Sequence, residues 1–223
     1  MQILLNKMSE NIIEKTIIFV KQQLQNIESG HDWFHIERVY KNALLIAKTE
    51  NCNLLVVQLA ALLHDIADSK FNDGDETIGP KTAREFLISN NIEPEIIDQI
   101  VFIIENISFK GGNFERKKST IELEIVQDAD RLDAIGAIGI ARTFNYGGYK
   151  NRQIYNPEIA PNLAMTKEQY KNSEAPTINH FYEKLLLLKD KMNTETAKKI
   201  ALKRHQFMEN FLEQFYHEWN GKK

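Results

Sequence analysis

The segment LLVVQLAALLHDIAD, residues 54–68, joins a long apolar run to a group of ionisable residues. Over residues 53–67 the apolar side chains cover nearly every side of a helix, and this pattern predicts a central helix that is buried all round. His64 and Asp65 stand side by side near its end, and Asp68 follows about one turn later. Burying an unpaired carboxylate is costly or shifts its pKa until it is neutral. We therefore expect a cation beside these acids.

Helical spacing dominates the rest of the chain. Apolar residues recur at intervals of three and four, which is typical of amphipathic helices. This spacing predicts further helices over residues 9–27, 34–50, 177–191 and 194–219. No strand-like alternation is longer than a few residues, so the sequence predicts an all-α fold.

Residues typical of helix ends divide these segments. They are Pro80 and Pro94 for first turns, Ser119 with Glu122 as a capping box, Gly147-Gly148 for a helix end, and Asn193 or Thr194 as a cap. Between residues 149 and 176 the helical period is lost, and three of the five prolines lie there. A loop of this length is unusual inside a compact domain, and it is either a functional lid or a disordered insertion.

Composition and charge restrict the class of protein. The net charge of −3 argues against a non-specific nucleic-acid binder, which would usually be basic. The single cysteine, Cys52, excludes an internal disulfide and fits a reducing compartment. No apolar stretch reaches the roughly 20 residues that a membrane span needs, and the first apolar run is too short for a signal peptide. We expect a cytoplasmic protein with no nucleic-acid and no membrane partner.

Two other segments carry histidine and aspartate in close spacing: SGHDWFHIERV, residues 29–39, and QDADRLDAIGAIG, residues 127–139. Two neutral imidazoles and two carboxylates around a divalent ion form a net-neutral site, and this donor set suits Mn, Fe, Co, Ni or Zn. Residues 64 and 65 point about 100° apart on a helix, so they converge only where the helix ends or faces a gap. Helices contributing His35, His64-Asp65 and Asp130 would form a metal site in a bundle core.

The order His35, His64-Asp65 and Asp130 resembles the HD superfamily of metal-dependent phosphohydrolases. The local contexts HIERV, LLHDIAD and QDADRLDAIG carry the resemblance, which spans residues 29–139, about half the chain. The longer motifs GHDWFHIERV, HDIAD and DADRLDAIGAIGIART are similar to a bacterial subgroup of small stand-alone HD proteins that is associated with nucleotide pyrophosphohydrolase activity. The residue pattern predicts one domain with a C-terminal helical pair packed on it. Together with the resemblance, it predicts a helical metal-binding core over 1–146, a loop or lid over 147–176, and C-terminal helices over 177–223.

The resemblance further implies that His35, His64, Asp65 and Asp130 bind one divalent transition metal, with Mg also an option. Such an ion lowers the pKa of a water and polarises a phosphoryl oxygen, so that hydroxide attacks phosphorus in line. The expected reaction converts a (d)NTP to the monophosphate and pyrophosphate. The alternatives are a nucleotidase or phosphomonoesterase and a non-catalytic nucleotide sensor. A small-molecule nucleotide is the expected partner, and a homodimer is an option.

Other candidates surround this set. Asp68 would position or deprotonate the water, although many HD proteins carry Lys there. His31 either supports the site or caps the helix that begins near Asp32. The candidate substrate contacts are Arg38, Lys110, Arg131, Asp133 and Lys184. Arg38 could instead pair with a carboxylate, Lys110 could be an ordinary exposed lysine, and Lys184 and Arg204 could lie on the surface, which is the interpretation favoured for Arg204.

Overall fold

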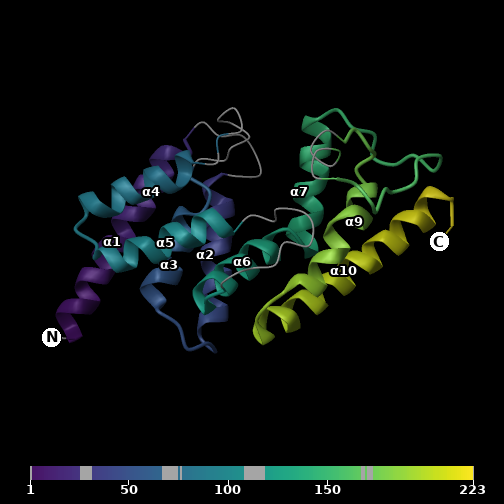
Figure 1. Cartoon of the computed structure of the whole chain (residues 1–223). Coiled ribbons are helices and arrows are strands. Elements are labelled where there is room, and N and C mark those ends of the chain that lie inside the picture. The colour runs from purple at the N-terminus through teal and green to yellow at the C-terminus, as the bar shows by residue number, and fades with distance from the viewer. Residues whose placement is uncertain are drawn as a thin grey trace. The chain divides into compact units, whose positions relative to one another are not determined.

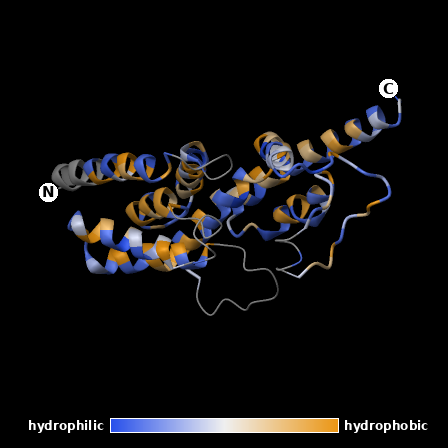
Figure 2. Cartoon of the chain, turned by 90° about the horizontal axis from the view of Figure 1, so that it is seen from above, coloured by the Kyte–Doolittle hydropathy of each residue, from blue (hydrophilic) through white to orange (hydrophobic). Residues whose placement is uncertain are grey.

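The computed structural model describes residues 2–25, 32–66, 75, 77–107, 119–166, 169 and 173–222. The regular elements in these ranges are all helical, which confirms the all-α prediction (Figure 1). They are α1 (Gln2–Gln23), α2 (Trp33–Ala47), α3 (Leu54–Leu63), α4 (Ile78–Ser89), α5 (Pro94–Asn106), α6 (Ile121–Asp133), α7 (Gly136–Tyr149), α9 (Asn179–Glu183), the 3-10 helix η2 (Leu185–Lys191) and α10 (Glu195–Trp219). Orange hydrophobic and blue hydrophilic residues recur along the helices (Figure 2), as amphipathic helices require.

The described residues form two compact units. The first contains α1 to α5 and α6 up to Ala129, and the second begins at Asp130 and contains the end of α6 together with α7, α9, η2 and α10. The division falls inside a continuous helix. Among the described residues, no helix is both long enough and apolar enough to cross a lipid bilayer.

In the first unit, α3 is the central helix, packed against α1, α2 and α5. Its residues from Leu59 to Leu63 are completely buried, whereas Leu54 in the first turn is 49% exposed. The predicted burial on all sides therefore holds for the second half of the helix only. Burying one Leu or Val side chain contributes about 1.5–3 kcal/mol, so this segment anchors the core. The helix is shorter than the predicted 53–67. It begins after Asn53, whose side chain accepts from the N–H of Val56, and it ends at Leu63.

Other helix ends also differ from the predictions. Helix α1 covers Gln2–Gln23 in place of 9–27. The predicted Ser119–Glu122 capping box is wrong, because Thr120 Oγ1 accepts from the N–H of Leu123 and Ser119 donates to Glu124. The cap therefore lies one residue later than predicted. Pro94 occupies the first turn of α5, as predicted.

In the second unit, α7 contains the two glycines that were predicted to end it. A Cβ atom at Gly147 would lie 2.2 Å from Oγ1 of Thr177, so this glycine permits close packing and does not terminate the helix. The helix α10 packs against α7, and Thr194 caps it by accepting from the N–H of Ala197, as predicted.

The predicted helix over 177–191 is broken. Its first part is α9, and its second part is the 3-10 helix η2. Lys184 lies between them with φ −143° and ψ −58°, outside the helical region. Leu185 and Leu188 of η2 are buried, so the apolar run is core as expected. The tighter 3-10 turn changes which side chains share a face.

The described part of the loop that follows α7 is held by hydrogen bonds within the second unit. The N–H of Thr177 donates to the carbonyl of Gln153 at 2.8 Å, and the N–H of Ile178 donates to the carbonyl of Ile154 at 3.0 Å. Further along, the N–H of Asn162 donates to the Glu183 carboxylate. These bonds join the loop to α9. Its role as a lid stays a prediction.

Candidate metal centre

His35 is positioned by the start of α2. The helix is capped by Asp32, whose carboxylate accepts from the N–H of His35 at 2.9 Å. His35 is 2% exposed, whereas its neighbour Phe34 is 62% exposed. The cap thus fixes the first turn and directs the His35 imidazole inward. His31, the alternative cap and candidate site residue, lies outside the described residues.

His64 is positioned by the end of α3, where it is the C-cap residue. Its Nδ1 lies 2.9 Å from the carbonyl oxygen of Ala61. A carbonyl oxygen can only accept, so Nδ1 carries the proton and the lone pair is on Nε2, which is buried. A hydrogen bond of this kind orients a metal-binding imidazole and fixes its tautomer.

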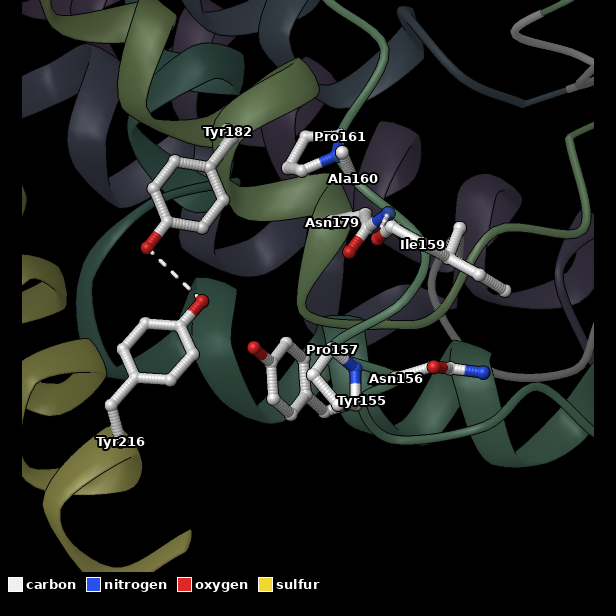
Figure 3. A pocket seen from close by; sticks show the side chains of 9 residues that line it. All are labelled: Tyr155, Asn156, Pro157, Ile159, Ala160, Pro161, Asn179, Tyr182 and Tyr216. Atoms are coloured by element: carbon white, nitrogen blue, oxygen red, sulfur yellow. Dashed lines mark hydrogen bonds between the residues drawn. The ribbon is translucent and has the colours of Figure 1, made fainter. Parts of the chain in front are cut away.

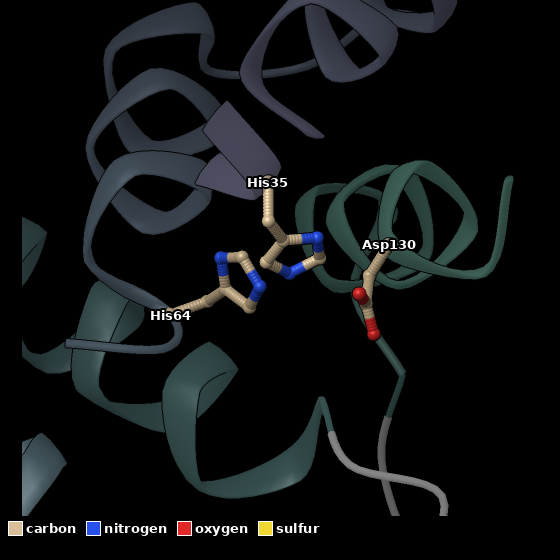
Figure 4. A group of neighbouring side chains, drawn as sticks. All are labelled: His35, His64 and Asp130. Carbon is tan, nitrogen blue, oxygen red and sulfur yellow. The ribbon is translucent and has the colours of Figure 1, made fainter. Parts of the chain in front are cut away.

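His35, His64 and Asp130 offer ligand atoms that all lie within 4.8 Å of one another (Figure 4). The two imidazole rings are 5.4 Å apart, edge to face. Metal–ligand bonds of about 2.1 Å place ligand atoms about 3–4 Å apart around an ion. The cluster therefore fits a divalent ion after small side-chain movements, and its nitrogen and oxygen donors suit a transition metal.

Asp65 stands beside this cluster. Its Oδ2 lies 3.8 Å from Nε2 of His35, and its side chain is 16% exposed. Helix α3 ends at Leu63, and His64 and Asp65 lie in the turn that follows it. The helix therefore ends beside the pair, as the sequence predicted, although His64 keeps helical backbone angles, with φ −63° and ψ −27°. Asp65 as the fourth ligand stays a prediction.

The residues of α6 that follow Asp130 make structural contacts in the second unit. Asp133 is 1% exposed, and its Oδ2 accepts from Nη1 of Arg142 at 2.5 Å. Arg131 is buried and donates to the carbonyl of Lys191. Both contacts engage groups that were candidates for substrate binding, and their substrate roles stay predictions.

Arg204 was expected on the surface, and this is wrong. Its guanidinium donates to the carbonyl of Leu132, and its aliphatic stem packs against Gly136, where a Cβ would lie 3.0 Å from it. Burial lowers the pKa of Arg204, and Asp133 raises it. The sequence analysis misplaced Arg204 and did not consider Arg142, whose guanidinium donates to Asp133.

Lys184 belongs to the second unit, as does Asp130, one of the predicted metal ligands. Burial lowers the pKa of its ammonium group below the usual value, the charge of Asp130 raises it, and the charge of Arg142 lowers it further. Lys184 and Asp130 are therefore close enough to interact. Arg38 lies on α2 about one turn after His35 and is half-buried. Asp68 and Lys110 lie outside the described residues.

Comparison with known proteins agrees with this geometry. The family model described as HD domain matches residues 33–135. The protein YpgQ of Bacillus subtilis is 37% identical over 202 residues, which are 90% of each chain. An HD-superfamily hydrolase from Bacillus thuringiensis is 46% identical, with a TM-score of 0.77 over 96% of this chain and all of the other. YpgQ in a crystal structure with ADP is 34% identical, with a TM-score of 0.75 over 95% of this chain and 96% of the other.

Proposed function

Because this chain belongs to the HD superfamily of metal-dependent phosphohydrolases, we propose that it hydrolyses (d)NTPs to the monophosphate and pyrophosphate. The observation that carries the proposal is the convergence of His35, His64 and Asp130 within 4.8 Å. The ADP complex of the relative YpgQ supports a nucleotide as the substrate.

We assign each residue of the centre a separate role in this reaction. His35, His64 and Asp130, with Asp65 as the fourth, would hold the divalent ion. When bound, such an ion supplies a Lewis acid that lowers the pKa of water and polarises a phosphoryl oxygen. The hydrogen bond between His64 Nδ1 and the Ala61 carbonyl orients the imidazole, so that Nε2 would be the ligand atom.

Lys184 is the proposed contact for the polyphosphate. A triphosphate brings several negative charges to the centre, and a nearby ammonium group offsets them. Lys184 is held close enough to Asp130 for the two charges to interact, which supports this placement. A bound phosphate stabilises the charged form of Lys184, which burial disfavours, so substrate and lysine stabilise each other.

A product assay tests the proposal. Metal-stripped protein is incubated with each dNTP and NTP plus Mn²⁺, and phosphate is separated from pyrophosphate. The test variant is Asp65→Ala, and the matched control is Asp98→Ala, which removes an exposed carboxylate on α5. Pyrophosphate that is lost only in Asp65→Ala supports the proposal.

Two other outcomes of the product assay would replace the proposal of a pyrophosphohydrolase. Inorganic phosphate released from nucleoside monophosphates would assign a nucleotidase. The absence of any turnover, with one metal bound per chain, would assign a nucleotide sensor.

A further inference from the structure

The second compact unit contains a pocket that is separate from the metal centre. Its volume is about 390 Å³, within the range of small-ligand sites. Its walls come from the loop after α7, at residues 155–157 and 159–161, and from α9 and α10 (Figure 3). None of the predicted metal ligands or substrate contacts lines it.

Lys184 is not among the residues that line the pocket. Asn179 and Tyr182 line it, and their spacing of three places them on one face of α9. Lys184 follows the last residue of α9 and has a non-helical φ of −143°. A ligand in the pocket would therefore occupy a second site, distinct from the one where Lys184 interacts with Asp130.

The chemistry of the walls indicates an uncharged, flat ligand. No Lys, Arg, Asp or Glu side chain lines the pocket, so it offers nothing to neutralise a phosphate. Three tyrosine rings and two prolines form the walls. The ring of Tyr155 also packs edge to face against Tyr216, with ring centroids 5.3 Å apart. Aromatic walls of this kind favour stacking with a planar ring.

The polar atoms of the pocket are fixed in direction. Asn179 is 1% exposed, and its Nδ2 donates to the carbonyl of Ile159 at 3.0 Å, which directs Oδ1 toward the tyrosines (Figure 3). The hydroxyl of Tyr182 donates to that of Tyr216 at 3.1 Å, so the Tyr216 proton is available to a ligand. Burial raises the pKa of Tyr216, which keeps this donor protonated. The pocket thus offers an acceptor at Asn179 and a donor at Tyr216, and the polar side chains of Tyr155 and Asn156 also line it.

We propose that this pocket binds the base of a purine nucleoside. A purine presents an N–H donor to Asn179 Oδ1, a ring nitrogen acceptor to the Tyr216 hydroxyl, and a flat face to Tyr155. The ribose would lie toward solvent. The site goes beyond the proposed hydrolysis, because it recognises the base without any phosphate or metal.

The test is isothermal titration calorimetry of the full chain with adenosine and guanosine in the presence of EDTA, with ribose as a control ligand. We expect saturable binding of one nucleoside per chain. Ala160→Phe fills the pocket and should weaken binding at least 10-fold, on the order of what one lost aromatic contact contributes. Ala164→Phe, the same change in the same loop but outside the lining, should leave the dissociation constant within about twofold of wild type.

Tyr216→Phe provides a second variant with no added bulk. It removes one donor and should weaken binding about 2- to 10-fold. Absence of saturable binding by the wild-type chain up to about 5 mM nucleoside would overturn the proposal. Equal binding by Ala160→Phe would also overturn it, since the nucleoside would then lie elsewhere. Neither result bears on hydrolysis, because EDTA removes the metal and nucleosides lack phosphates.

Discussion

The ion pair between Asp133 and Arg142 leads to a prediction about the stability of the second unit. Replacing Arg142 by Met keeps much of the side-chain stem and removes the charge. Asp133 would remain as a carboxylate that is 1% exposed. Removing one partner of a fully buried pair costs about 3–5 kcal/mol. Arg142 is 25% exposed and Arg204 also interacts with Asp133, so we expect a smaller loss of about 2–3 kcal/mol.

A double-mutant cycle measures this pair. Urea unfolding is followed by circular dichroism for Arg142→Met, Asp133→Asn and the double variant. We expect the double variant to be more stable than the sum of the single losses predicts, with a coupling energy above about 1 kcal/mol. If Arg142→Met unfolds within about 0.5 kcal/mol of wild type and the coupling is near zero, the ion-pair reasoning is refuted. Asp133 would then be available for its predicted contact with a substrate.

Three further outcomes are expected. Lys184→Met should raise KM for the nucleotide about 10-fold or more, because a phosphate loses its charged partner, and an unchanged KM in steady-state kinetics would contradict this role. Burial, with the nearby charge of Lys184, lowers the pKa of His180 from 6.5 to about 3. As the pH falls below 6.5, His180 is protonated in the unfolded chain while it stays neutral in the folded chain. The free energy of unfolding therefore decreases, by up to about 2 kcal/mol at pH 5. Urea unfolding of His180→Gln should lack this part of the pH dependence, and equal curves for both proteins would exclude His180 as its source. Gly139→Ala should lower the free energy of unfolding by about 1–3 kcal/mol, because the added Cβ would clash with the Ala134 carbonyl. Gly148→Ala, where nothing lies within 4 Å of the added Cβ, should not lower it. Thermal melting of both variants checks this difference.

The centre of the first unit could be predicted because its signals are local. A run that is apolar at nine of its ten positions, 54–63, favours a buried segment. The polar pair His64-Asp65 could converge only if the helix ended there. The structure places that end at Leu63. Periodicity alone did not locate it, because the apolar pattern continues through Ile66, which is buried in the following turn.

The second unit was harder to predict because its contacts join residues far apart in sequence. The charge of Arg204 on an amphipathic helix looks like surface, and only the packing of α10 against α7 shows that it reaches the carbonyl of Leu132. The break at Lys184 has no glycine or proline to signal it. The four leucines at 185–188 are compatible with an α-helix and with the 3-10 helix that forms, so they do not distinguish the two.

The complete burial of α3 from Leu59 to Leu63 has a consequence for the proposed binding of metal ions. Its packing is set by α1, α2 and α5, so folding pre-organises His64 and Asp65 before any ion arrives. The C-terminal end of a helix also carries a partial negative charge that favours a cation. If the cluster binds an ion as proposed, we expect that one divalent ion can be exchanged for another without unfolding the chain. The ion found in the protein would follow its availability in the cell and the affinity order of the donors.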